Sequence, residues 1–181
     1  MKKVIFLLMA VSVFLFIACN KTDHRKETEK ILKVWMGKII QFPADIRPTV
    51  FCNDTLRQIP ETPYKILLYT DSVGCTSCKL SLVVWKLFIK EVEASMPDKL
   101  SFLFYFHPKS QDELRFIFKH DRFDYPVFID KKNEIGKLNK FSNKIEYQCF
   151  LLDKDNRVVL VGNPTLNSQI WHLFKQIVKE K

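Results

Sequence analysis

The sequence has no long run of basic residues, although 29 Lys and Arg against 20 Asp and Glu give it a formal charge of +9. The basic residues are scattered between acidic and apolar ones along the chain. A clustered basic patch is the usual electrostatic footprint of a nucleic-acid-binding protein, so we expect no nucleic acid among the partners. Scattered charge is typical of a solvated surface, which can also face anionic lipid head groups.

Internal repeats, low-complexity segments and a second motif-spaced cysteine pair are missing as well. Structural zinc takes about four ligands, often from two such pairs. The single pair Cys75 and Cys78 therefore disfavours a zinc site, and we expect no metal and no other cofactor. The 181 residues are about the length of one domain, and a hydrophobic content of 47% is ample for one packed core.

The longest apolar run stands at the very start of the chain. It extends from Val4 to Phe16, follows Lys2 and Lys3, and is broken only by Ser12. A run this short, which leads to a small residue, predicts a removable signal peptide rather than a membrane span.

The end of this run carries a second signal. The stretch Phe16-Ile17-Ala18-Cys19 resembles the lipobox of bacterial lipoproteins, with Phe16 where Leu is usual. The resemblance implies that residues 1–18 are removed and that the Cys19 sulfur carries a diacylglyceryl anchor with acyl chains such as palmitate. The alternative is an uncleaved N-terminal anchor, and both place the domain on the far side of the membrane. Asn20 is not the Asp that retains lipoproteins at the inner membrane in some bacteria, which favours the outer membrane.

Residues 19–62 are expected to form a lipid-anchored tether, an N-terminal helix and an extended segment. An apolar helical stripe ends at Gly37, which is a natural stop for a helix. Prolines punctuate the segment that follows. Within it we expect a short strand over Val50–Cys52 and a turn at Asn53–Asp54.

Residues 63–181 alternate between strand and helix patterns. The apolar spacing predicts strands over Tyr64–Asp71, Leu100–Phe106, Tyr125–Ile129, Tyr147–Leu152 and Arg157–Val161, and helices over Cys75–Met96, Ser110–His120, Glu134–Phe141 and a C-terminal stripe that ends at Val178. The first strand–helix–strand unit should be parallel, and the turn Asp153–Asn156 indicates a hairpin. The sequence therefore predicts an α/β fold: a mixed central sheet with helices on both faces and a β-α insertion before the C-terminal hairpin and helix.

The candidate chemistry lies between the first buried strand and the helix after it. A cysteine in the first turn of a helix lies near the positive end of the helix dipole and near unpaired N–H groups. Both favour the thiolate, which is the nucleophile. Cys75 is therefore the expected attacking thiol. Cys78, one turn further on, is the expected resolving thiol, and Lys79 adds positive charge nearby.

From about Tyr64 to Lys181 the chain resembles the thioredoxin superfamily, most closely the membrane-anchored thiol-disulfide oxidoreductases of the TlpA/ResA type. The residues that carry the resemblance are Cys75-Thr76-Ser77-Cys78 after a strand, Tyr125-Pro126-Val127-Phe128-Ile129-Asp130, and the hairpin segment Phe150–Val159. The resemblance implies a thioredoxin-like fold. It also implies disulfide exchange with protein thiols or disulfides in the cell envelope, with electrons from a membrane donor.

The chain departs from this family at two places. Gly74 stands before the first cysteine, where the family usually has an aromatic residue. The family also has a cis-proline just before the third core strand, facing the cysteine pair. Aligning on Phe150–Asp153 places Tyr147 at that position; Pro126 is the alternative, but a turn and helix pattern follows it. A missing cis-proline would change how the site holds a substrate peptide.

For four further residues the sequence is compatible with either a chemical or a structural role. His107 follows the second buried strand, at the end where such sheets place their sites; it either modulates the thiols, helps bind copper, or is a surface histidine. Asp71 is a proton acceptor or a turn former. Cys149 is a third redox thiol or an inert buried cysteine, and Cys52 is isolated in the sequence.

The predicted function is thus an envelope lipoprotein thiol-disulfide oxidoreductase, anchored through Cys19 with its domain facing the periplasm or the cell exterior. The alternative is a non-enzymatic thioredoxin-like binding module, for copper handling or an envelope complex, in which Cys75 and Cys78 form a structural disulfide. A peroxidase is disfavoured because the residues before Cys75 lack the Thr and Pro spacing of peroxiredoxins.

Overall fold

The computed structural model describes residues 25–72 and 80–180. The chain divides into two compact units, the first ending at Trp35 and the second beginning at Met36. The described part of the first unit is one helix over residues 25–35, which confirms the helix expected before Gly37. Gly37 has a φ of +77°, a left-handed conformation that glycine adopts without strain and that ends helices.

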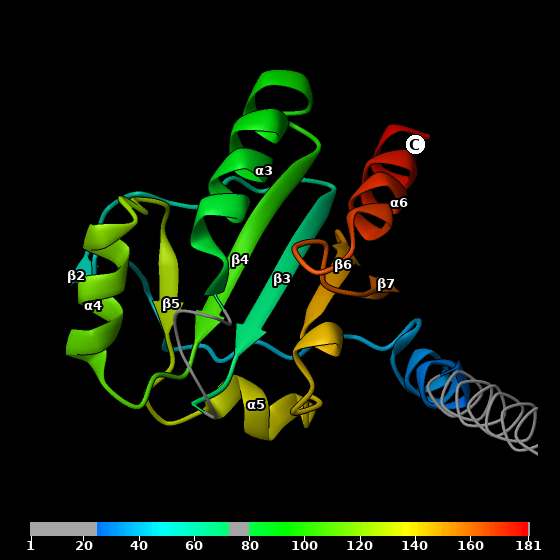
Figure 1. Ribbon diagram of the computed structural model, residues 1–181, viewed down its shortest axis with the longest axis horizontal. Helices are drawn as coiled ribbons and strands as arrows, with labels where there is room; N and C mark the ends of the chain where they lie inside the picture. Colours follow the sequence, from blue (N-terminus) through cyan, green and yellow to red (C-terminus); the bar gives the residue numbers. More distant parts are fainter. Residues whose placement is uncertain (1–24, 73–79, 181) are drawn as a thin grey trace, which may run out of the picture. The chain divides into compact units, whose positions relative to one another are not determined.

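The described part of the second unit is built on a seven-stranded sheet in the order β2-β1-β5-β4-β3-β6-β7 (Figure 1). The strands are β1 (Pro48–Val50), β2 (Asn53–Asp54), β3 (Tyr64–Thr70), β4 (Leu100–Phe106), β5 (Val127–Ile129), β6 (Cys149–Asp153) and β7 (Val158–Val161). The central strands β3, β4 and β5 are parallel, whereas β6, β7, β1 and β2 pair antiparallel. This confirms the mixed sheet, and β1 and β2 join it from the extended segment.

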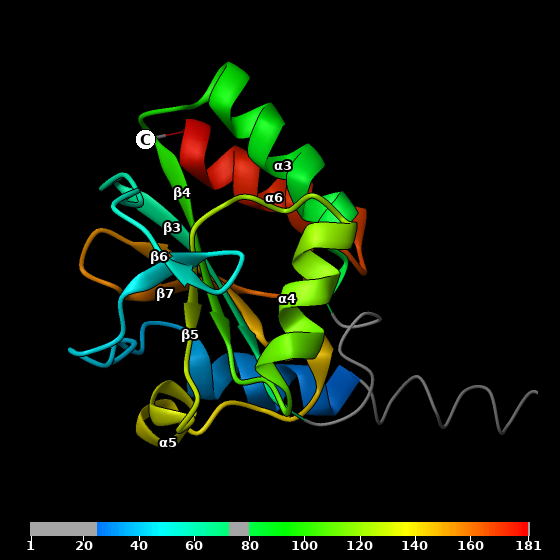
Figure 2. The same cartoon turned by 90° about the vertical axis from the view of Figure 1, so that its left-hand side faces the viewer.

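Helices lie on both faces of this sheet, as predicted (Figure 2). Three of them, α3 (Leu82–Ser95), α4 (Gln111–His120) and α6 (Ser168–Lys179), cover one face. Their apolar sides share one core with alternate residues of β3, β4 and β6. The short helix α5 (Glu134–Asn139) lies toward the other face, where Tyr69 of β3 meets its N-cap residue Asn133.

Aromatic rings fill much of the core under the three helices. Trp85 of α3 is fully buried and meets Phe102 and Phe104 of β4 edge-on. Phe88 of α3 stacks on Trp171 of α6 with ring centroids 4.3 Å apart. Large rings bury more apolar area per residue than aliphatic side chains, so a sheet of short strands still supports a substantial core.

The insertion predicted before the C-terminal hairpin is β5 followed by α5. After it the chain returns to pair β6 with β3 and then turns into β7. The turn between β6 and β7 is stabilised by residues within the turn itself. Asp153 Oδ1 accepts hydrogen bonds from the backbone N–H groups of Asp155 and Arg157, both at 2.9 Å. Asn156 has a φ of +60°. Asn is one of the few non-glycine residues that tolerate this conformation.

The turn in the first hairpin differs from the prediction. Val50 pairs with Asn53, so the two turn residues are Phe51 and Cys52, both with positive φ, and Asn53–Asp54 forms β2. Local preference would place Asn and Asp in such a turn. The observed register instead buries the Cys52 side chain, so a tertiary contact outweighs the local signal.

The helix predicted over Cys75–Met96 is interrupted in its described part. Leu80 is helical, Ser81 has a φ of +45°, and α3 begins at Leu82. Successive helical residues are about 100° apart around the axis, so a continuous helix would point Leu80 and Leu82 to different sides. Because the chain breaks at Ser81, both leucines are buried.

Candidate functional site

Three strands bring their ends to one edge of the sheet. Thr70, the last residue of β3, is paired with Phe106, the last residue of β4. His107 donates its backbone N–H to the Thr70 carbonyl at 2.9 Å. Strand β6 runs the opposite way, so its first residue, Cys149, pairs with Leu68 at this same end of β3. Open α/β sheets bind and react outside the carboxyl ends of their parallel strands, which makes this edge the candidate site.

Cys75 and Cys78, and likewise Cys19, lie outside the described residues. The described chain passes from the end of β3 to Ser72 and resumes at Leu80, just before α3. By its place in the chain, the Cys-x-x-Cys motif therefore belongs to the connection between the carboxyl end of β3 and the helix of the βαβ unit.

Asp71 directly follows β3 and is tied to the start of β6. The side-chain Nε2 of Gln148 donates to Asp71 Oδ2 at 3.0 Å and to the Ser142 carbonyl at 2.8 Å. The Gln148 carbonyl accepts the backbone N–H of Tyr69 at 2.9 Å. Gln148 thus joins the end of β3, the loop after α5 and the start of β6. The sequence patterns do not single it out, apart from being a polar residue inside the apolar run Tyr147–Leu152.

His107 is held by its ring at the same edge. Its Nδ1 lies 2.9 Å from the carbonyl oxygen of Asp130, which follows β5. A carbonyl can only accept, so Nδ1 carries the proton in this contact and Nε2 of the neutral ring keeps its lone pair. Asp130 is itself buried; its Oδ2 accepts the backbone N–H of Ile135 at 2.8 Å, which fastens the first turn of α5.

Tyr69 marks the other face of the sheet below this edge. Its hydroxyl donates to Asn133 Oδ1 at 2.8 Å, and its ring lies against Phe141 with centroids 4.6 Å apart. Burial raises the pKa of Tyr69 to about 12; the bond with Asn133 opposes the shift, and the charges of Asp71 and Asp130 add to it. The negative charge of Asp71 therefore helps to raise the pKa of the Tyr69 hydroxyl.

The position that the resemblance assigns to a cis-proline has a different structure here. Tyr147 ends a short 3-10 helix, Ile145–Tyr147, and its side chain is buried, so β6 starts two residues later than predicted. The described residues contain no cis peptide bond. Pro126 precedes β5, which is parallel to β4, and not the antiparallel strand beside β3. The insertion interpretation is thus confirmed, with Tyr147 before the third core strand.

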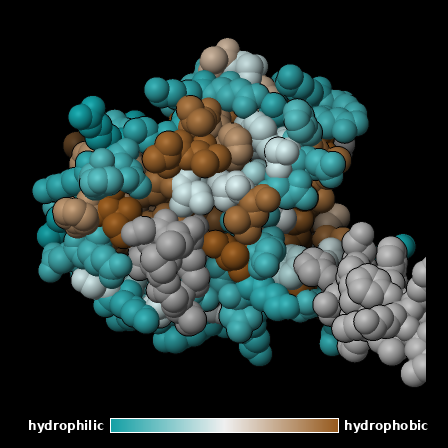
Figure 3. Space-filling view, in the orientation of Figure 1, coloured by the Kyte–Doolittle hydropathy of each residue, from teal (hydrophilic) through white to brown (hydrophobic). Residues whose placement is uncertain are grey.

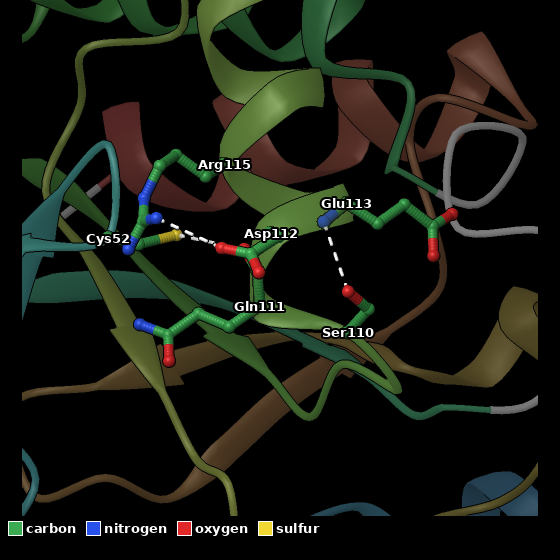
Figure 4. A network of polar contacts seen from close by, with 6 residues as sticks. All are labelled: Cys52, Ser110, Gln111, Asp112, Glu113 and Arg115. Carbon is green, nitrogen blue, oxygen red and sulfur yellow. Dashed lines mark hydrogen bonds and ion pairs between the residues drawn. The ribbon is translucent and has the colours of Figure 1, made fainter.

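Cys52 and Cys149 are free thiols within the core, and they lie in different places. Cys149 is completely buried, and burial raises its pKa. Cys52 lies under the start of α4, where its Sγ is 3.9 Å from the Gln111 carbonyl (Figure 4). Burial raises the pKa of Cys52 too, and the nearby Arg115 only partly opposes this. Both environments disfavour the reactive thiolate.

Figure 4 also shows how α4 begins. Ser110 accepts the backbone N–H of Glu113 on its hydroxyl oxygen at 3.2 Å, which is the N-cap expected from their spacing. The helix therefore starts where the sequence indicated, and its first turn holds Cys52 away from solvent.

The described residues were also searched for metal sites, membrane spans and cavities. They contain no cluster of three or more His, Cys, Asp or Glu side chains that could hold a metal ion. Among the residues 25–72 and 80–180, no helix is both long and apolar enough for a membrane crossing. A hollow of about 230 Å³ between α3, Leu100 and Tyr125 lies at the opposite, amino-terminal end of β4.

Apolar side chains gather on the outer face of α3 (Figure 3). Val83 and Leu87, one turn apart near the start of this helix, are 60% and 61% exposed. Both lie on the helix that follows the motif in the chain, so part of the exposed surface of this helix is apolar.

The sheet order, the parallel βαβ unit around the cysteine motif and the C-terminal hairpin with its helix together define a thioredoxin-like fold. Solved structures agree. The chain is similar to a thioredoxin-like protein in its oxidised form, with 14% identity over 82% of this chain and 99% of that one and a TM-score of 0.54. It is similar to a proposed protein disulfide isomerase from Bacteroides thetaiotaomicron, with 16% identity over 79% and 91% of the two chains and a TM-score of 0.52.

A third similar structure is the bacterioferritin comigratory protein of Xanthomonas campestris, which is described as reducing alkyl peroxides. The identity is 13% over 77% of this chain and 98% of that one, with a TM-score of 0.53. No protein-family model and no curated protein matches the sequence. At these identities the likeness establishes the thioredoxin-like fold, and the reaction has to be argued from the residues of this chain.

Proposed function

We propose that this chain is a lipid-anchored envelope protein that exchanges disulfides with other proteins through Cys75 and Cys78. The observation that carries the proposal is the place of the motif: Cys75-Thr76-Ser77-Cys78 connects the carboxyl end of a central parallel strand to the following helix of a thioredoxin-like fold. This is the position where open α/β sheets place reactive groups. We also expect the thiolate to be favoured in this connection, because it leads into a helix and the amino-terminal end of a helix carries positive partial charge.

The proposed exchange balances as follows in the reducing direction. The Cys75 thiolate attacks one sulfur of a substrate disulfide; a Cys75–substrate bond forms, the substrate S–S bond breaks, and one substrate thiolate leaves. Cys78 loses its proton to solvent, attacks the Cys75 sulfur and releases the second substrate thiolate. Two electrons have passed to the substrate and the pair is a disulfide, so a membrane electron donor must return two electrons.

Two features of the described residues support this assignment. Cys52 and Cys149 are buried with raised pKa values, which leaves the motif cysteines as the candidates for exchange in the mature domain. The exposed Val83 and Leu87 offer apolar surface near the start of α3, the helix that follows the motif in the chain, which suits contact with a protein substrate.

Trapping tests the assignment. In the Cys78→Ala protein nothing remains to resolve the mixed disulfide, so adducts between Cys75 and substrates should accumulate in cells and disappear with reductant. Cys75→Ala is the matched control and should trap far less. Cys52→Ala and Cys149→Ala, each combined with Cys78→Ala, should leave trapping intact.

The alternatives give different results in the same experiment. A binding module yields no adducts and keeps its stability when Cys75 and Cys78 are both changed to Ala. A structural disulfide yields no adducts and loses stability in that double variant; its reduction potential would also lie below about −300 mV. Either outcome would refute the oxidoreductase proposal.

Anchoring through Cys19 is a separate part of the proposal with its own test. Cys19→Ser should block lipid attachment and either release the protein from the membrane fraction or leave it unprocessed. Metabolic labelling with a radioactive fatty acid measures this directly. Equal label on wild type and variant would refute the lipid anchor without touching the redox proposal.

A further inference from the structure

The segment with which the chain enters the second unit is fastened to α5. Asn139, the buried last residue of this helix, pairs with Gln41 in both directions: its Oδ1 accepts the Gln41 backbone N–H at 2.9 Å, and its Nδ2 donates to the Gln41 carbonyl at 2.8 Å. The Lys38 ammonium donates to the Asn139 carbonyl at 3.0 Å. The second unit begins at Met36, so α5 lies beside its first residues.

Although the sequence has no long basic run, positive charge gathers on α5 and its flanks. Residues 131–144 contain five Lys and one Glu. By contrast, α3 and α4, which cover the other face of the sheet, each contain two basic and two acidic residues. The lysine surface consists of five exposed side chains: Lys131, Lys132, Lys137, Lys140 and Lys144.

The helix presents part of this surface directly to solvent. Ile135 and Asn139 are one turn apart and buried, so the side of α5 that they share faces the domain. Successive helical residues are about 100° apart around the axis, which places Lys137 on the opposite side. Its neighbour Leu138 is 47% exposed. The outer side of α5 therefore combines positive charge with one exposed apolar side chain.

Nearby carboxylates do not cancel this charge. Asp45 and Glu134 line one hollow together with Lys131 and Lys132. Among the described residues, however, neither these two lysines nor Lys137 and Lys140 form an ion pair. The lysine surface thus keeps a net positive charge that can bind anions outside the domain.

The chain between Cys19 and this surface is short. Residues 25–35 are helical. At about 1.5 Å for each helical residue and at most about 3.5 Å for each of the others, the path from Cys19 to Lys38 spans no more than about 45 Å. A lipid on Cys19 therefore keeps the entry to the second unit, and with it α5, near the bilayer.

We propose that the lysine surface binds the anionic phospholipid head groups of the membrane to which Cys19 anchors the chain. The inference rests on the proposed lipid anchor and is independent of the disulfide exchange. An anionic leaflet attracts Lys side chains within about a Debye length of its surface, and the exposed Leu138 suits the boundary between head groups and acyl chains. The anchor limits the distance from the bilayer, and the lysine surface selects the face of the domain that turns toward it.

Lysine acetylation of the full-length protein, purified from membranes and added to preformed vesicles, tests the proposal. With about 30 mol% phosphatidylglycerol in phosphatidylcholine, the lysine surface should react at least about threefold more slowly than with phosphatidylcholine alone. Lys90 and Lys119, exposed on α3 and α4, should react equally with both vesicles. The protection should disappear in about 1 M salt, where the Debye length is about 3 Å. Mass spectrometry resolves each site.

A matched pair of variants separates local from overall charge. Lys137→Gln/Lys140→Gln should reduce the protection of the remaining lysine surface, whereas Lys90→Gln/Lys119→Gln removes the same charge from the other helices and should leave it intact. Equal loss in both variants, or equal reactivity of wild type with both vesicles, would overturn the proposal. Protection by soluble poly-glutamate but not by anionic vesicles would also overturn it, because the surface would then bind an acidic protein.

Failure of the anchor gives a different result from failure of the lysine surface. A wild-type protein that incorporates labelled fatty acid but shows no protected lysines would refute the lysine surface and retain the anchor. Protected lysines in a protein without fatty-acid label would refute the anchor and retain the lysine surface.

Discussion

The indole N–H of Trp171 on α6 donates to Glu91 Oε2 on α3 at 2.8 Å. The Lys175 ammonium, one turn further along α6, donates to the other carboxylate oxygen at 2.6 Å. The Lys175 hydrogen bond is the main reason that the pKa of Glu91 lies below its usual value. Because Phe88 stacks on the Trp171 ring beside this contact, one carboxylate joins the two helices that flank the core.

Replacing this carboxylate should weaken the fold only moderately. Glu91→Gln should lower the free energy of unfolding by no more than about 1 kcal/mol, because the ion pair is partly exposed and screened. The folded-state pKa is depressed, so the contribution is complete above the ordinary value of 4.5 and is lost as the pH falls through the folded-state value. Urea unfolding at pH 7 and about pH 3 measures this, with exposed Glu93→Gln as control. A difference from wild type that persists unchanged in acid would contradict it.

Two phenylalanines of α4 provide a matched pair for the core. Phe118 is 1% exposed and packs between Phe106 and Phe123, whereas Phe116 is 69% exposed. Phe118→Leu should cost about 1 to 2 kcal/mol because it leaves unfilled volume among rings. Phe116→Leu should stay within about 0.5 kcal/mol of wild type. Equal losses in urea unfolding would show that α4 does not pack on the sheet through Phe118.

The sequence predicts an element well where its signals are local. Strand β4 has the predicted bounds Leu100–Phe106, because seven consecutive residues suit a strand buried on both faces. Helix α4 starts after Ser110 because the cap and the first turn are encoded within four residues. The parallel pairing of β3 and β4 follows from the length of the connection between them.

The structure differs from the sequence-based predictions where contacts between residues far apart in the chain determine the local conformation. The first hairpin turns at Phe51–Cys52 because that register buries Cys52 under α4, which lies some sixty residues away in the sequence. The bond between Gln148 and Asp71 joins residues 77 positions apart, and no periodicity or motif contains it. The candidate edge could therefore be located from the sequence through the cysteine motif, but its supporting polar contacts could not.

The two buried cysteines should be slow to react in the folded protein. In the Cys75→Ala/Cys78→Ala protein, iodoacetamide at pH 8 should modify Cys149 only as the domain unfolds, because this thiol has no solvent access and a raised pKa. Cys52 is 7% exposed and should react somewhat faster. Mass spectrometry of the modified protein resolves the two sites, and denatured protein is the control. Rapid modification of Cys149 under native conditions would revive its role as a third redox thiol.

The Tyr69 hydroxyl and the Asn133 side chain approach Gly136 of α5 so closely that a side chain at position 136 would not fit. A Cβ at this position would lie 2.7 Å from the Tyr69 hydroxyl and would collide with the Asn133 side chain. Gly136→Ala should therefore break the hydrogen bond between Tyr69 and Asn133 and lower the free energy of unfolding by about 1 to 2 kcal/mol, despite the better helix propensity of alanine.

A double-mutant cycle gives this prediction its sharpest form. Tyr69→Phe removes the hydroxyl and releases Asn133 to rotate away, so in its presence Gly136→Ala should cost clearly less than it does alone. Lys137→Ala, an exposed neighbour in α5, should cost little in either background. Urea unfolding of the four proteins of the cycle yields the coupling energy. If Gly136→Ala costs the same with Phe as with Tyr at position 69, the clash lies elsewhere, and the close approach of α5 to β3 would not depend on this hydroxyl.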